Sequence, residues 1–176
     1  MSTSDFITSG LRTVAMEALA VSAMTPSINE SFSLACQTML ACEGRVIVTG
    51  MGKSGHIGNK IAATLASTGT PAFFVHPGEA SHGDLGMITK SDVVIAISNS
   101  GNTAEVITIL PLIKRLGIPL ISMTGDPKSL LSQTADANLD VSVSSEACPL
   151  NLAPTTSTTV TLVMGDALAI ALLESR

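Results

Sequence analysis

Apolar runs recur along this chain, and each is followed by a segment with apolar positions at helical spacing. The runs predict strands at residues 45–49, 72–75, 93–97, 119–123 and 138–143. The helical spacing predicts helices at residues 4–24, 26–42, 56–68, 104–116 and 157–174, with a short helix near Leu130. Continuous apolar strands that alternate with helices are typical of a parallel sheet covered on both faces.

We therefore expect an α/β fold, a doubly wound five-stranded parallel sheet flanked by helices. The 176 residues show no linker, repeat or low-complexity segment, which predicts one domain over residues 1–176. Helices within residues 1–44 are expected to pack on that domain. In such folds the ligand binds at the carboxyl ends of the strands, so the loops after the predicted strands are the places to search for a site.

The most informative of these loops follows the third predicted strand and reads SNSGNT. It opens a predicted helix, whose start offers unpaired N–H groups and a partial positive charge. Ser98, Ser100 and Thr103 add hydroxyl donors, Asn99 lies between them, and Gly101 lets the backbone approach a ligand closely. An ordinary helix cap needs one hydroxyl, so this loop favours a phosphorylated ligand over capping alone.

A second glycine-rich loop, GMGKSG, follows the first predicted strand. It matches the dinucleotide pattern GxGxxG and contains the Gly-Lys-Ser of a P-loop. However, Ile47 stands where a P-loop has its first glycine, and the second strand runs into His76 where a dinucleotide fold has an acid. We therefore interpret Gly52 and Ser54 as a second wall of the phosphate pocket, to which Lys53 presents a cation.

Two further loops complete the candidate pocket. The loop GEASHGDLG, after the second predicted strand, contains His82, a candidate acid or base. The alternative is that His82 only fixes its loop through hydrogen bonds. The segment PTTSTT, ahead of the last predicted helix, has more hydroxyls than a cap needs, so Thr155 and Ser157 are interpreted as a pocket wall for a polyol.

Composition narrows the class of function. Charged residues make up only 13% of the chain and hydrophobic residues 45%, which indicates that sister subunits cover much of the surface. A net charge of −5, with four Phe and no Tyr or Trp, argues against nucleic-acid binding. The most apolar segment, residues 160–173, is too short to span a membrane and contains Asp166, so a buried helix is expected.

The remaining features point to a cytoplasmic protein without a metal. Residues 1–23 lack the cationic start of a signal peptide, so we expect neither secretion nor a membrane partner. Three cysteines without CxxC spacing predict no disulfide framework and no zinc site. Cys36 and Cys42 are expected to be small core residues, and nothing near Cys148 in the sequence predicts a thiol of lowered pKa.

The motifs together, in this order, resemble the sugar isomerase (SIS) domain family over nearly the whole chain. The matching stretches are GMGKSGHIG, ASTGTP, HPGEASHGDLG, ISNSGN and ACPLNLAPT. The resemblance implies an aldose–ketose isomerase without a cofactor that interconverts D-ribulose 5-phosphate and D-arabinose 5-phosphate through an enediol. It also implies a homotetramer and a role in supplying Kdo for lipopolysaccharide or capsule.

By position, Lys53, His82 and Glu105 match catalytic or near-catalytic residues of the family, with Glu105 as the expected base. Most members continue into a pair of CBS modules and carry a histidine shortly after the last helix. This sequence ends at Arg176, so a single-domain form is expected. Two alternatives stay open, a non-catalytic sugar-phosphate sensor and an isomerase of another sugar phosphate.

Overall fold

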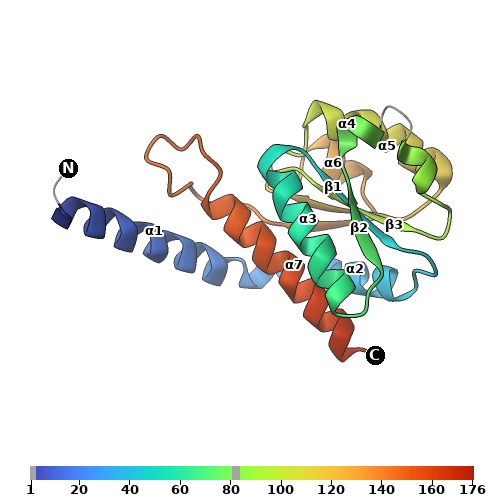
Figure 1. Ribbon diagram of the computed structural model, residues 1–176, viewed down its shortest axis with the longest axis horizontal. Helices are drawn as coiled ribbons and strands as arrows, with labels where there is room; N and C mark the ends of the chain where they lie inside the picture. The colour runs from blue at the N-terminus through green and yellow to red at the C-terminus, as the bar shows by residue number, and fades with distance from the viewer. Residues whose placement is uncertain (1–2, 81–83) are drawn as a thin grey trace.

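The computed structural model describes residues 3–80 and 84–176 (Figure 1). Its strands are β1 (Val46–Gly50), β2 (Ala72–Val75), β3 (Val93–Ile97), β4 (Leu120–Thr124) and β5 (Ala137–Asp140). Its helices are α1 (Thr3–Ala23), α2 (Glu30–Leu40), α3 (Gly52–Ser67), α4 (Pro77–Ala80), α5 (Ala104–Leu116), α6 (Leu130–Thr134) and α7 (Thr156–Glu174). Short 3-10 turns lie at Thr25–Ser27 and Asp84–Met87.

The strands form one five-stranded sheet in the order β2-β1-β3-β4-β5, with every neighbouring pair parallel. This confirms the predicted fold class. Strands β1 and β3 are neighbours although β2 lies between them in sequence, so the chain reverses its direction of winding there. That reversal leaves a crevice at the carboxyl ends of β1 and β3, where ligands of doubly wound sheets bind.

Helices cover both faces of the sheet. One core lies between the sheet and helices α2, α3 and α7, and includes Val48, Ile95, Ile61 and Met164. The other lies between the sheet and helices α5 and α6, and includes Ile47, Val94, Ile113 and Leu131. Alternate residues of β1 and β3 enter opposite cores, as the period of two in a strand requires. Burial on both faces explains why these strands are apolar without interruption.

Helix α7 packs beside α3, and the two run in the same direction (Figure 1). Gly165 permits this close approach, because a Cβ atom there would overlap the side chain of Ile61. Lys60 of α3 also forms an ion pair with Asp166 of α7. Among the described residues, α7 is the one helix with the length and apolar composition to cross a membrane, but half of that stretch is buried in the protein. Its place in the core confirms the predicted buried helix.

Three predicted boundaries were wrong by three residues or more. Helix α2 begins at Glu30 rather than at residue 26, because the side chain of Asn29 caps it there. Helix α3 begins at Gly52 rather than at residue 56, so the last four residues of the glycine-rich motif are helical instead of forming a loop. Strand β5 ends at Asp140, three residues before the predicted end, because the backbone N–H of Ser142 bonds to the side chain of Asp140 instead of continuing the ladder.

Candidate functional site

The candidate site lies at the carboxyl ends of β1 and β3. These strands pair in register up to Gly50 and Ile97, so the segments that follow them leave the sheet side by side. Helix α3 begins two residues after β1, and α5 begins seven residues after β3. The starts of two long helices therefore flank one crevice, and each start carries a partial positive charge.

At the start of α3, Gly52, Lys53 and Ser54 form the first turn. The residue before the helix, Met51, has no side chain that can cap it, so the first N–H groups of α3 have no side-chain acceptor there. Lys53 is exposed and forms no ion pair with any described residue. His56, expected to open the helix, lies in its second turn and is exposed. This helix start thus combines free backbone donors with an exposed cation.

The start of α5 is likewise uncapped by a side chain. Thr103 occupies the cap position, but its hydroxyl pairs with that of Ser98 at 2.7 Å instead of with the helix. Ser98 also accepts a hydrogen bond from the backbone N–H of Gly101 at 3.1 Å and is buried. The hydroxyl of Ser98 therefore stabilises the loop through internal hydrogen bonds and is not free to bind a ligand in the crevice. One hydroxyl proton of the pair stays available, and the more exposed Thr103 is the residue that can offer it.

The loop between these residues is held rigidly. Gly101 has a positive φ of 64°, and a Cβ atom there would overlap Ser129, so no other residue fits this position well. The backbone carbonyl of Asn99 accepts a bond from Gly125 after β4, and the side chain of Asn102 accepts one from the N–H of Leu130. Ser100 is exposed, and its hydroxyl accepts a bond of 3.3 Å from the N–H of Asn102, which leaves its own proton free to donate.

Of the two expected acid–base residues, Glu105 and His82, the structure describes only Glu105. Glu105 lies in the first turn of α5, two residues after Thr103, and is half-buried without an ion pair to any described residue. That position puts a carboxylate at the same edge as Lys53. His82 lies outside the described residues. Among the residues that are described, no group of three or more His, Cys, Asp or Glu could hold a metal ion.

The start of α7 differs from the other two because a carboxylate caps it. Glu146 accepts hydrogen bonds from the backbone N–H groups of Thr155 and Ser157 at 2.8 and 3.1 Å, and from the Thr155 hydroxyl at 3.1 Å. The Thr155 hydroxyl also accepts a bond from the N–H of Ala147. Both predicted wall residues thus bond to Glu146, which the sequence reading did not single out. An anion is therefore better accommodated between α3 and α5 than at α7.

Glu146 is ionised at neutral pH. Burial raises the pKa of its carboxyl, but the hydrogen bonds from Ser157 and Thr155 outweigh burial, and the pKa lies below its ordinary value. No local motif identifies this residue, since its partners are nine and eleven residues further along the chain. Glu146 is thus, besides Glu105, a second carboxylate at a helix start, and its helix, α7, runs beside α3.

One expectation about the cysteines was wrong. The backbone N–H groups of Ala153, Leu152 and Leu150 surround the Cys148 thiol and lower its pKa. The turn that gathers these donors includes Asn151 in the left-handed region, at φ 53°, which the sequence does not reveal. Burial raises the pKa of the Cys36 thiol, and likewise that of Cys42, in agreement with their packing against the core.

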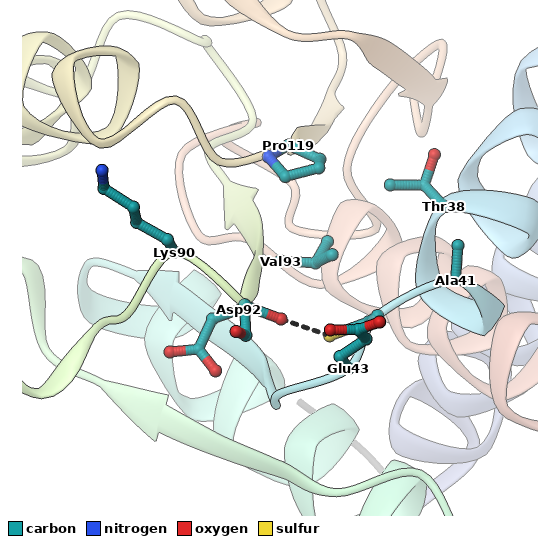
Figure 2. A pocket seen from close by; sticks show the side chains of 9 residues that line it. Thr38, Ala41, Glu43, Lys90, Asp92, Val93 and Pro119 are labelled. Atoms are coloured by element: carbon teal, nitrogen blue, oxygen red, sulfur yellow. Dashed lines mark hydrogen bonds between the residues drawn. The ribbon is translucent and has the colours of Figure 1, made fainter.

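A separate cavity of about 460 Å³ opens at the other edge of the sheet, where β3 and β4 begin (Figure 2). Asp92 lies in its wall and bonds to the N–H groups of Arg45 and Thr89 at 2.8 and 2.7 Å. The Cys42 thiol donates to the carbonyl of Ser91. These bonds join the loops that precede β1 and β3, so Asp92 stabilises the fold at the end away from the candidate site.

Comparisons with known proteins show the family of the chain. Residues 39–171 match the family model of the SIS domain. Over 172 residues the chain is 69% identical to arabinose 5-phosphate isomerase KdsD of Pseudomonas aeruginosa PAO1, covering 98% of this chain and 53% of that protein. It is 59% identical to the enzyme of the same name from Escherichia coli K12, of which it covers 52%. The chain thus spans about half the length of the curated relatives it matches.

A solved structure is similar over nearly its full length. It is the protein c3406 of E. coli CFT073, determined in complex with arabinose 5-phosphate. The two chains are 47% identical and superpose with a TM-score of 0.95, over 99% of this chain and 93% of that one.

Proposed function

Because the chain belongs to the SIS domain family, we propose that it is an aldose–ketose isomerase that interconverts D-ribulose 5-phosphate and D-arabinose 5-phosphate. The observation that carries this proposal is the pair of helix starts, α3 and α5, without side-chain caps at the crevice between β1 and β3. Two such starts suit a dianionic phosphate, since both offer N–H donors and partial positive charge.

The residues around the crevice supply the remaining chemistry. Ser54, Ser100 and Thr103 donate to the phosphate and the sugar, which positions the open-chain substrate. Lys53 stabilises the negative charge that develops on the enediolate oxygen. These interactions need no permanent ligand or cofactor, because the reaction moves hydrogen within one molecule.

Proton transfer is assigned to Glu105. Its carboxylate removes the proton from carbon 2 of the aldose, and the electron pair of that C–H bond forms the enediol double bond. The proton held by the base exchanges with solvent while the enediol is bound, and a proton from the base is then added to carbon 1 and gives the ketose. An acid is also needed to shuttle protons between the two oxygens, and His82 is assigned that role on its sequence match alone.

The biological setting follows from the same assignment. Arabinose 5-phosphate feeds Kdo synthesis, so the proposed role is to supply lipopolysaccharide or capsule from the cytoplasm. The low content of charged residues supports a homo-oligomer, for which the proposed form is the tetramer implied by the family resemblance.

A substrate panel tests the proposal. The chain is incubated separately with arabinose 5-phosphate and with five-, six- and seven-carbon aldose phosphates, and ketose formation is measured. Turnover of arabinose 5-phosphate above the others is expected. Preferred turnover of another sugar would reassign the substrate, and binding without turnover would make the chain a sensor.

A further inference from the structure

The side chain of Asn102 joins the loop of Ser100 to helix α6. Its amide nitrogen donates to the backbone carbonyl of Ser100 at 3.1 Å, and its amide oxygen accepts from the N–H of Leu130 at 3.2 Å. The backbone N–H of Asn102 also donates to the Ser100 hydroxyl at 3.3 Å. One residue therefore holds both polar groups of Ser100 that face it, and both ends of its own amide are bonded.

Helix α6 gives this side chain a fixed support. Ser129 caps the helix by bonding to the N–H of a later residue, so the N–H groups of the first two helical residues need other acceptors. The amide oxygen of Asn102 accepts from Leu130, and the backbone carbonyl of Gly101 accepts from Leu131. The loop thus supplies acceptors that the start of α6 lacks.

The rest of the loop is held without the side chain of Asn102. The carbonyls on either side of Ser100 accept backbone N–H bonds, one from Gly125 after β4 and one from the start of α6. Among the described residues, the carbonyl of Ser100 itself accepts only the bond from the Asn102 amide. Asn102 is exposed, so water can replace its bonds and the fold does not depend on them.

We propose that Asn102 is a positioning residue that holds Ser100 against α6 and directs the Ser100 hydroxyl toward the substrate phosphate, an assignment that rests on the proposed function. The hydroxyl oxygen accepts from the N–H of Asn102, so its proton points away from that N–H and is free to meet a ligand. An amide suits this position because it both donates and accepts, whereas a carboxylate would only accept and would repel a phosphate.

A double-variant cycle of Asn102→Ala and Ser100→Ala tests the proposal, with arabinose 5-phosphate as substrate. Asn102→Ala should raise KM about fivefold and leave kcat nearly unchanged, because ordering the loop then costs binding energy in the ground and transition states alike. In the Ser100→Ala background the same change should raise KM less than about twofold, since the hydroxyl that Asn102 positions is already absent.

Asn29→Ala is the matched control. Asn29 is also exposed, and its amide is likewise bonded at both ends, accepting from the N–H of Ser31 and donating to the carbonyl of Pro26 at the start of α2. This variant should lower the melting temperature at least as much as Asn102→Ala does, while KM and kcat keep the wild-type values. Equal rises in KM for the two variants would overturn the proposal, because general loosening of the fold would then account for both.

Two further results would overturn the proposal while the proposed function stands. These are an unchanged KM in Asn102→Ala, and the same rise in KM in both backgrounds. If the wild type binds arabinose 5-phosphate without turnover, the dissociation constant from titration calorimetry replaces KM in the same cycle. A wild type that neither binds nor converts the sugar phosphate would instead refute the proposed function, and the role of Asn102 with it.

Discussion

Ser100 is the one serine of its loop whose hydroxyl is both exposed and able to donate outwards, since Ser98 is used inside the loop. We expect Ser100→Ala to raise KM about tenfold, or about 1.4 kcal/mol, and to change kcat little. The reason is that a phosphate contact is equally strong in the ground and transition states. Steady-state kinetics measure both constants. Ser132→Ala, on α6, is the control and should alter neither, whereas a fall in kcat alone at Ser100 would exclude a phosphate contact.

Glu105 gives the sharpest prediction at the level of one residue. Glu105→Gln keeps the shape of the side chain and removes the base, so kcat should fall at least a hundredfold, about 2.7 kcal/mol. KM and the melting temperature should stay near the wild-type values, because a carboxylate in a first helical turn contributes at most about 1 kcal/mol to stability. Glu43→Gln, at the opposite edge of the sheet, controls for the loss of a charge. If the variant still exchanges substrate hydrogen with solvent, Glu105 is not the base, and Glu146 or His82 would be the next candidate.

Glu146 makes stability depend on pH. Its pKa in the folded protein lies below the value of about 4.3 expected in the unfolded chain, so the unfolded chain binds more protons between the two values. The contribution of Glu146 to the free energy of unfolding is therefore complete above about pH 5. It is lost as the pH falls through the pKa of Glu146 in the folded protein. At pH 7 we expect Glu146→Gln to lower the free energy of unfolding by about 1.5–3 kcal/mol. Urea unfolding at several pH values should show this difference shrinking below pH 4, and a difference that does not change with pH would contradict the charged cap.

At the scale of elements, the contact between α3 and α7 depends on Gly165. Gly165→Ala places a Cβ atom against Ile61 and should cost about 1–3 kcal/mol of stability, because a packed core absorbs an added methyl poorly. Thermal unfolding of Gly165→Ala, Ile61→Ala and the double variant measures the coupling. The penalty at Gly165 should become smaller once Ile61 is alanine. Equal penalties in both backgrounds would mean that the helices do not meet there.

The helices and strands also show how much of the fold could be predicted from the sequence. The bounds of β2, β3 and α5 were predicted correctly, because residues buried on both faces of a strand and the apolar face of a helix leave clear patterns. The start of α3 was missed, since Gly52, Lys53 and Ser54 are typical of a loop and only the packing of α3 on the sheet makes them helical. The short helix α4 has no periodic pattern to detect.

The candidate site was predictable in its location more than in its contacts. Parallel strands brought the loops after β1 and β3 together as expected, because their carboxyl ends share one edge. The internal bond between Ser98 and Thr103, and the capping of α7 by Glu146, arise from the folded loops and have no local signal in the sequence.

At the scale of the whole molecule, stabilising bonds between loops and the candidate site lie at opposite edges of one sheet. Asp92 joins loops at the amino end, whereas the uncapped starts of α3 and α5 meet at the carboxyl end. In helix α1, Ala20 and Val21 pack against the core under α7, whereas the large apolar side chains nearer its start are exposed. The fold therefore leaves the carboxyl edge of the sheet free for the proposed sugar phosphate.

The most direct test of the central claim is isomerisation by this chain in deuterated water. With arabinose 5-phosphate as substrate, the account predicts D-ribulose 5-phosphate that carries solvent deuterium at carbon 1, seen by NMR, because a base transfers the proton through an enediol. Arabinose 5-phosphate that binds without forming the ketose, or a ketose that stays unlabelled after many turnovers, would contradict it.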